Sequence, residues 1–411
     1  MGKTYCNNYP LVFIHGLIGW GSDDKLNDLN VFPYFGRGKN NIPKYLEGLG
    51  YECYTPSVGP FSSCWDRACI FWAWLFGGTV DFGKVHSEKY GHARYGVTYK
   101  RGAIEDLGKP GNHAKINLLG HSYGGPTVME IASLFEQGSK EEREGTPADE
   151  LSPLFKGGHG SLIHTVTTLS GVNNGTTVAS MSTKIHTMDM AIYGTFALTA
   201  FYEKTPVMKY YDTGLQMWGV KTYPWENKGW WFQNPLKYFP NAVRFARNKG
   251  YDNVGNELRV EVAQKEMLPS RVMDPTAYYF AQRAFKTKDD GHGHQVPDHM
   301  TWFCRYTAYP AGRFAPHYLK KYGVTKDDIN WLRNDGFVNL RGSSAPFNMP
   351  FADLPKETAY DPASKIPGLW YNMPPVYGDH IWWNNLLTDN PEERLKHYAK
   401  MADLYRQLPD A

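Results

Sequence analysis

The chain has 411 residues, of which 42% are hydrophobic, so it is long enough to bury a large core. The formal net charge is only +3, and no run of lysine or arginine indicates a nucleic-acid-binding surface. The five cysteines are too few and too scattered to predict a disulfide framework or a thiolate metal site.

Short apolar segments alternate with helical ones in the N-terminal third of the chain. The composition predicts strands at 10–16, 51–57, 115–122 and 163–171, which are rich in Val, Ile, Leu and Thr. Between the last two, "GGPTVMEIASLFEQG" carries apolar residues at helical spacing and ends in a glycine suited to a helix C-cap. This alternation predicts an α/β fold, with a mostly parallel sheet covered by helices on both faces.

Two regions interrupt the alternation, at about 60–100 and about 180–250. The first is rich in Gly, His and aromatic residues, and the second in Tyr, Trp, Phe and Met. We expect both to be insertions above the sheet of a single domain that spans residues 1–411. The most apolar long window, residues 190–202, is too short for a transmembrane segment. The N-terminus also lacks the pattern of a signal peptide, as would a mature secreted domain.

The pentapeptide Gly120-His121-Ser122-Tyr123-Gly124 fits the pattern G-x-S-x-G, and it stands between an apolar run and an amphipathic segment. In that position the pattern predicts a sharp strand-to-helix turn that exposes the serine hydroxyl. Side chains in place of the two glycines would collide with the neighbouring backbone. At the start of the helix, backbone N–H groups and the helix dipole favour a developing negative charge. We therefore predict that Ser122 is a nucleophile.

Such a nucleophile needs an acid and then a histidine later in the chain. Asp335 in "WLRNDGFVN" precedes a short apolar run, and His380 in "YGDHIWWNN" lies in a polar loop near the C-terminus. From the residues alone, an ordinary Asn-Asp-Gly turn and a surface histidine are equally good interpretations of these two positions.

The reaction also needs two backbone N–H groups to stabilise the oxyanion. Gly16 directly follows an apolar run and lets the backbone approach closely, so Leu17 could present one N–H group. Tyr123, the residue after the nucleophile, would supply the other. The alternative for this segment is a glycine-rich turn without that role.

The first insertion carries three side chains suited to zinc, namely Asp66, His86 and His92. Asp81 and Glu88 are competing carboxylates nearby. Since surface histidines beside glycines are common, the residues alone leave a site without metal as the alternative.

Eight blocks of the sequence then form a recognisable series. They are "YPLVFIHGLIGWG", "VGPFSSCWDRAC", "GGTVDFG", "GHARYG", "LLGHSYGG", "SPLFKGGH", "TTLSGVNNGTT" and "NDGFVN". In content and order they resemble the zinc-containing secreted lipases of thermophilic bacilli, staphylococci and clostridial relatives. The resemblance spans most of the chain and does not depend on G-x-S-x-G alone.

This resemblance implies an α/β-hydrolase fold with a zinc-bearing insertion and an aromatic helical lid. Matched by position, Ser122 is the nucleophile, Asp335 the acid and His380 the base. Leu17 and Tyr123 match the oxyanion donors.

The resemblance also implies that Asp66, His86 and His92 are three zinc ligands. Counting back from "TAYYFA" places Glu257 at the fourth ligand position, with Asp252 as the competitor. With four ligands the zinc would be structural, because a closed tetrahedral shell leaves no position for an activated water.

The expected function is that of a secreted serine carboxylester hydrolase, a lipase or esterase, which cleaves water-insoluble esters such as triacylglycerols. Polyesters are a further candidate substrate. We expect transient contact with a lipid–water interface and no nucleic-acid partner. Two other classes stay open at this point. One is a metallohydrolase whose zinc performs the chemistry, and the other is a non-catalytic protein that binds lipids or surfaces.

Overall fold

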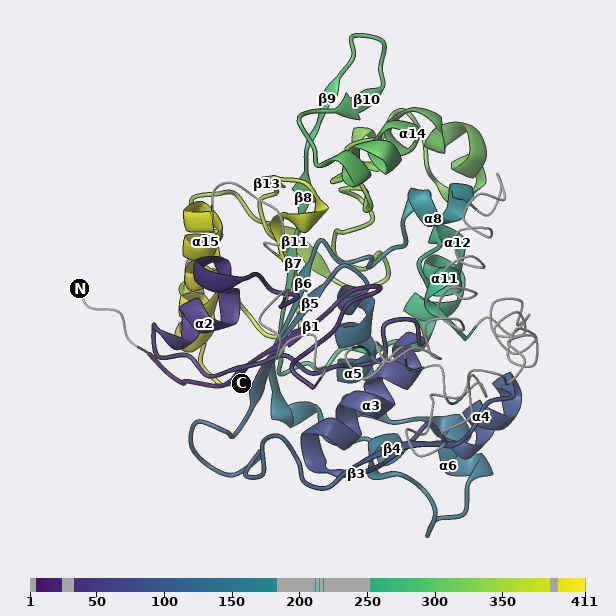
Figure 1. Cartoon of the computed structure of the whole chain (residues 1–411), viewed down its shortest axis with the longest axis vertical. Coiled ribbons are helices and arrows are strands. Elements are labelled where there is room, and N and C mark those ends of the chain that lie inside the picture. The colour runs from purple at the N-terminus through teal and green to yellow at the C-terminus, as the bar shows by residue number, and fades with distance from the viewer. Residues whose placement is uncertain are drawn as a thin grey trace, which may run out of the picture.

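Seven strands form the central sheet, in the order β11-β12-β7-β6-β5-β1-β2 (Figure 1). Every neighbouring pair in this sheet is parallel. The structure is a computed structural model that describes residues 5–23, 33–182, 211, 214, 217, 252–384 and 391–410. The strands are β1 Leu11–Ile14, β2 Cys53–Tyr54, β5 Ile116–His121, β6 Ile163–Leu169, β7 Tyr278–Gln282, β11 Phe351–Asp353 and β12 Trp370–Asn372.

Strand β1 shows why a strand of this sheet can be apolar throughout. Successive side chains of a strand point to opposite faces. Leu11 and Phe13 pack in one core cluster, and Val12 and Ile14 pack in the other. All four residues are buried. A parallel sheet with a core on each face therefore favours continuous apolar runs, and the four predicted strands are confirmed.

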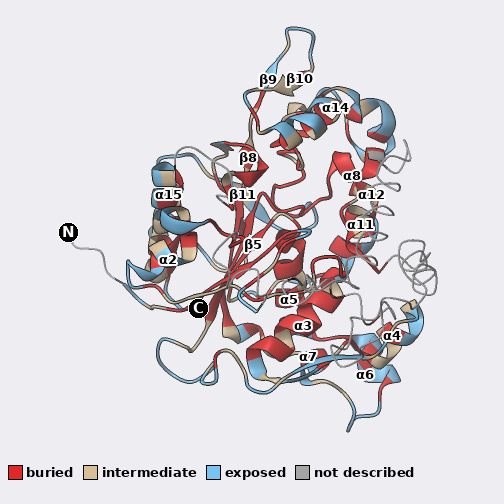
Figure 2. Ribbon diagram, in the orientation of Figure 1, coloured by how far each residue is buried: buried red, intermediate tan, exposed pale blue. Residues whose placement is uncertain are grey.

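Helices cover both faces of the sheet (Figures 1 and 2). On one face α2 (Ile42–Glu47) and α15 (Pro391–Gln407) contribute apolar side chains to the core that contains Leu11 and Phe13. On the other face lie α3 (Cys64–Phe76) and α5 (Gly124–Gln137), whose buried sides join the second core. The helix predicted after Ser122 ends at Gly138, with φ +64°, as its glycine indicates.

The insertion at about 60–100 folds outside the central sheet. After α3 it forms an antiparallel pair, β3 (Gly78–Asp81) with β4 (Tyr95–Tyr99), and α4 (Lys84–Tyr90) lies between these strands in the sequence. Most of the lid predicted at about 180–250 lies outside the described residues. Within the described residues, no helix combines the length and apolar character needed to cross a membrane.

Further helices and strands lie outside the central sheet. The helices are α6 Lys140–Gly145, α7 Pro153–Lys156, α8 Thr177–Ser182, α11 Val254–Glu257, α12 Val260–Val262, α13 Leu268–Ser270 and α14 Trp302–Leu319. Two small sheets pair β9 (Thr287–Asp289) with β10 (Gln295–Pro297) and β8 (Ala284–Phe285) with β13 (Val376–Tyr377).

Gly120 should tolerate no side chain, because a Cβ atom there would lie 2.0 Å from the carbonyl oxygen of Gly124. We expect Gly120→Ala to lower the free energy of unfolding by about 3 kcal/mol. Gly48→Ala is the control, since that residue has helical backbone angles and the nearest atom to its added Cβ would be Tyr45 O, at 3.3 Å. Chemical denaturation of both variants measures the effect, and equal stabilities would contradict the expectation.

Candidate active site

Ser122 stands at the turn between β5 and α5. Its φ is +59°, in the left-handed region, where a residue other than glycine is strained by about 1–3 kcal/mol. Hydrogen bonds hold the turn, because Ser122 N donates to Leu169 O at 3.0 Å and Gly125 N donates to Ser122 O at 2.9 Å. The turn is therefore the sharp strand-to-helix corner that the sequence predicts.

The glycines on either side of Ser122 are needed for close backbone packing. A Cβ on Gly120 would meet Gly124 O, and a Cβ on Gly124 would lie 2.4 Å from Ile14 O of β1. The predicted collision at both positions is confirmed.

The structure brings the side chains of Ser122, His380 and Asp335 into one hydrogen-bonded series. His380 Nε2 lies 2.8 Å from Ser122 Oγ, and His380 Nδ1 lies 2.8 Å from Asp335 Oδ2. An ionised carboxylate only accepts hydrogen bonds, so Nδ1 carries the proton and Nε2 can accept from the serine. This is the arrangement in which a neutral histidine can act as a base toward the hydroxyl.

Backbone contacts hold the acid and the histidine in place. Asp335 is fully buried, and its Oδ1 accepts hydrogen bonds from Phe337 N at 3.0 Å and Val338 N at 2.8 Å. His380 N donates to Asp335 O at 2.8 Å. The "NDGFVN" segment is thus a turn, and it also presents its carboxylate to the histidine.

The two residues predicted as oxyanion donors lie beside Ser122. Tyr123 follows it, and the loop that begins at Gly16 packs so closely that a Cβ there would lie 2.8 Å from Ser122 Cβ. Within the described part of the chain, neither Leu17 N nor Tyr123 N donates a hydrogen bond to the protein.

A second group of polar side chains consists of Asp66, His86, His92 and Asp252, and it is called the metal cluster below because it could hold a metal ion. One nitrogen or oxygen atom from each lies within 4.8 Å of the others. His86 Nε2 lies 3.1 Å from Asp252 Oδ2 and 3.4 Å from Asp66 Oδ1, and His92 Nε2 lies 3.4 Å from Asp252 Oδ2. The four side chains come from the first turn of α3, from α4 and the residue after its C-cap, and from the segment before α11.

The electrostatics of this cluster suit a cation. Burial and the neighbouring Asp252 raise the pKa of Asp66 to about 6. Burial alone would lower the pKa of His86, but Asp252 and Asp66 raise it to about 10. Both oxygens of Asp66 are buried and accept no hydrogen bond from the described residues. Two imidazoles and two carboxylates in this arrangement could hold a divalent metal ion.

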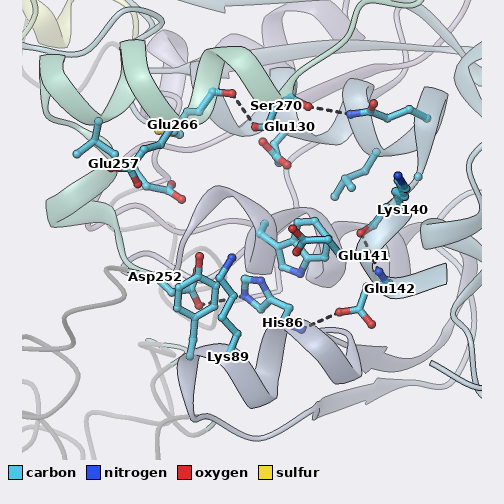
Figure 3. Close-up of a pocket in the computed structure, with 18 of the residues that line it drawn as sticks. His86, Lys89, Glu130, Lys140, Glu141, Glu142, Asp252, Glu257, Glu266 and Ser270 are labelled. Carbon is cyan, nitrogen blue, oxygen red and sulfur yellow. Dashed lines mark hydrogen bonds and ion pairs between the residues drawn. The ribbon is translucent and has the colours of Figure 1, made fainter. Parts of the chain in front are cut away.

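The structure groups Asp252, and not the predicted Glu257, with Asp66, His86 and His92. Figure 3 shows Asp252 beside His86, with Glu257 apart from both. Between the two acids the chain turns into α11, which carries the Glu257 carboxylate toward Tyr123 Oη at 2.5 Å and Cys64 N at 2.8 Å. Burial raises the pKa of Glu257 to about 7.

The sequence did not predict the contacts around the metal cluster. Glu142 of α6 accepts a hydrogen bond from His86 N at 2.7 Å, and the rings of Trp65 and His86 stack with centroids 4.8 Å apart. His92 Nδ1 bonds to Ala93 O at 2.9 Å, which turns Nε2 toward the carboxylates. Nothing in the local sequence distinguishes Glu142 from its neighbouring glutamates, since only the packing of α6 on α4 selects it. Asp81, one of the competing carboxylates, instead pairs with Arg94.

The chain is similar to known lipases over nearly its whole length. The family model described as "Lipase-like, C-terminal domain" matches residues 7–410. Lipase 2 of Staphylococcus aureus is 32% identical over 384 residues, which cover 91% of this chain and 50% of that protein. A lipase of Staphylococcus epidermidis is 31% identical over 389 residues, which cover 92% of this chain and 50% of that protein. The chain thus spans about half the length of these curated relatives.

Solved structures agree with the sequence relatives. The lipase of Staphylococcus hyicus superposes with a TM-score of 0.77 at 27% identity, covering 98% of this chain and 96% of that one. EstA of Clostridium botulinum gives a TM-score of 0.77 at 30% identity, covering 100% of this chain and 90% of that one. With the α/β architecture described above, these matches confirm the resemblance found in the sequence, and the chain belongs to the lipase-like C-terminal domain family.

Proposed function

We propose that this protein is a serine carboxylester hydrolase of the lipase type, which cleaves water-insoluble esters through an acyl-enzyme. The hydrogen-bonded series from Ser122 through His380 to Asp335, placed at a strained strand-to-helix turn, carries the proposal. The names of the relatives, three lipases and an EstA, support the same reaction class.

The reaction begins when Ser122 Oγ attacks the ester carbonyl carbon and His380 Nε2 takes the hydroxyl proton. Asp335 keeps Nδ1 protonated and stabilises the imidazolium that forms. His380 then gives its proton to the departing alcohol. Water attacks the acyl-enzyme in the same way, and the carboxylic acid leaves with Ser122 restored.

The negative oxygen of each tetrahedral intermediate would accept hydrogen bonds from Leu17 N and Tyr123 N. The N–H groups do not have to give up a protein acceptor when the oxyanion forms, because within the described residues they have none. Donors oriented before the reaction contribute most to the rate, since they need little reorganisation.

We assign the metal cluster a structural role and zinc as its ion. Asp66, His86, His92 and Asp252 would fill a tetrahedral shell, so no position is left to activate water. When bound, zinc would supply charge neutralisation and a link between α3, α4 and the segment before α11.

Lipid esters are the substrate class that we propose, with triacylglycerols first and polyesters as a further candidate. The expected contact is a transient one with a lipid–water interface. A secreted location belongs to the same proposal, and it is based on the resemblance to secreted lipases noted in the sequence.

Replacement of the nucleophile tests the reaction directly. We expect Ser122→Ala to lower hydrolysis of p-nitrophenyl esters by about 10⁴-fold or more, because no other group in the site can form the acyl-enzyme. The circular-dichroism spectrum and the metal content should not change. Substantial turnover by the folded variant would exclude the serine mechanism.

The chain-length profile of the wild-type protein identifies the substrate class. Turnover of p-nitrophenyl esters from acetate to palmitate should extend to the long acyl chains if the protein is a lipase. Activity confined to short chains would instead indicate an esterase, and polyester films would be the next substrate.

The corrected ligand set gives a further prediction. Asp252→Asn should weaken zinc binding by about a hundredfold or more and lower the thermal midpoint, whereas Glu257→Gln should keep its zinc. Metal analysis after dialysis and a thermal scan measure both effects. Loss of zinc from Glu257→Gln alone would contradict the correction.

A chelator separates the structural role of zinc from a catalytic one. Because the serine mechanism needs no metal, chelation at low temperature should leave turnover in place for as long as the protein stays folded. Immediate loss of turnover in protein that is still folded would favour a metallohydrolase.

A further inference from the structure

In the loop after β1, the backbone N–H group of Leu17 has no acceptor among the described residues. In this loop Gly16 N donates to Tyr34 Oη at 2.9 Å, Ile18 N to Pro60 O at 3.3 Å, and Gly19 N to Gly16 O at 3.1 Å. Of the four amides from 16 to 19, only Leu17 N has no acceptor among the described residues. The orientation of that N–H group is therefore determined by what holds its neighbours.

Two buried side chains hold the peptide group between His15 and Gly16 at both of its ends. Arg67 Nη2 donates to the carbonyl oxygen of His15, and Tyr34 Oη accepts from the N–H of Gly16. Arg67 lies on α3, and Tyr34 belongs to the segment before α2, so the two contacts come from separate parts of the fold.

The His15 ring holds the next peptide group, between Gly16 and Leu17. Val58 N donates to His15 Nε2 at 3.1 Å, so the proton of the neutral ring is on Nδ1, which donates to Gly16 O at 2.9 Å. Burial lowers the pKa of His15 to about 3, which keeps the ring neutral. With its carbonyl fixed in this way, the same peptide plane presents Leu17 N–H.

We propose that Arg67 and Tyr34 are positioning residues of the oxyanion hole, because they fix the His15–Gly16 peptide and thereby orient Leu17 N–H. The inference rests on the proposed serine mechanism, and it assigns roles to two side chains that do not touch the reacting atoms. The two residues together are called the loop clamp below.

Arg67 is placed to act on both oxyanion donors. Its guanidinium carbon lies 4.7 Å from the centroid of the Tyr123 ring, and Tyr123 bears the second N–H group. Arg67 is fully buried and forms no ion pair with the described residues. A buried guanidinium without an ion-paired carboxylate lowers stability, so a role in the site explains its presence better than a role in the core.

Tyr34 connects the loop after β1 to His380, the proposed base. His121 Nε2 lies 3.1 Å from the carbonyl oxygen of His380, which can only accept, so His121 Nε2 is the donor. Burial lowers the pKa of His121 well below its usual value, and the neutral ring therefore accepts at Nδ1 from Tyr34 Oη, 2.8 Å away. One series of hydrogen bonds thus runs from Gly16 N through Tyr34 and His121 to the backbone of His380.

Tyr34→Phe removes the hydroxyl group and leaves the ring. Activity is measured with p-nitrophenyl butyrate and with the matching thionoester, whose carbonyl oxygen is replaced by sulfur, a weaker hydrogen-bond acceptor. We expect kcat for the ester to fall about tenfold or more, with KM changed less than about threefold. The preference for ester over thionoester should fall as well, because a misaligned N–H group distinguishes oxygen from sulfur less.

Tyr279→Phe is the matched control. The Tyr279 hydroxyl is also buried and also bonds to a backbone N–H and a carbonyl, both of Asp274 in the turn before β7. It should lose stability in a thermal scan but keep kcat and the ester preference. Arg67→Met is the second clamp variant, and it should lower kcat and the ester preference in the same way. It keeps the test possible if Tyr34→Phe fails to fold.

The proposal is overturned if a folded clamp variant keeps the wild-type kcat and ester preference, or if the control changes both as strongly. Ser122→Ala distinguishes this failure from failure of the proposed function. An inactive Ser122→Ala with unaffected clamp variants removes only the clamp, whereas an active Ser122→Ala removes the serine mechanism itself.

Discussion

Close packing of backbone on backbone at Ser122 is the constraint on which the rest of the site depends. The left-handed turn at this residue is held because the carbonyl oxygens of Gly124 and Ile14 lie where side chains of Gly120 and Gly124 would be. Gly16 brings a second loop into contact with the same turn. The absence of side chains at these glycines therefore allows two separate backbone segments, 14–16 and 120–124, to meet around one hydroxyl.

Once the segments meet, buried polar side chains decide which backbone groups stay available to a ligand. Buried N–H and carbonyl groups are nearly always paired, so a donor reserved for substrate requires its neighbours to be satisfied elsewhere. Arg67, Tyr34 and His15 satisfy them in the loop after β1. His121, which directly precedes Ser122, extends the same network to the backbone of His380.

The metal cluster stands next to this network in the sequence and in space. Asp66 precedes Arg67 in the first turns of α3, while Asp252 is nearly two hundred residues further along the chain. A bound ion would therefore join α3 to distant segments and restrict the movement of the helix that carries Arg67.

How much could be predicted depended on the range of the interaction. The apolar runs, the glycines around Ser122 and the helix after it are local patterns, and the sequence alone determined that a parallel α/β sheet would present a serine at a strand-to-helix corner. The carboxylate after residue 250 that joins Asp66, His86 and His92 depends on a longer-range interaction. Asp252 and Glu257 both carry a carboxylate, and only the turn into α11 separates them. Arg67 and Tyr34 carry no motif, and only the tertiary structure decided their partners, since a side-chain hydrogen bond to a distant backbone atom depends on packing that no local pattern records.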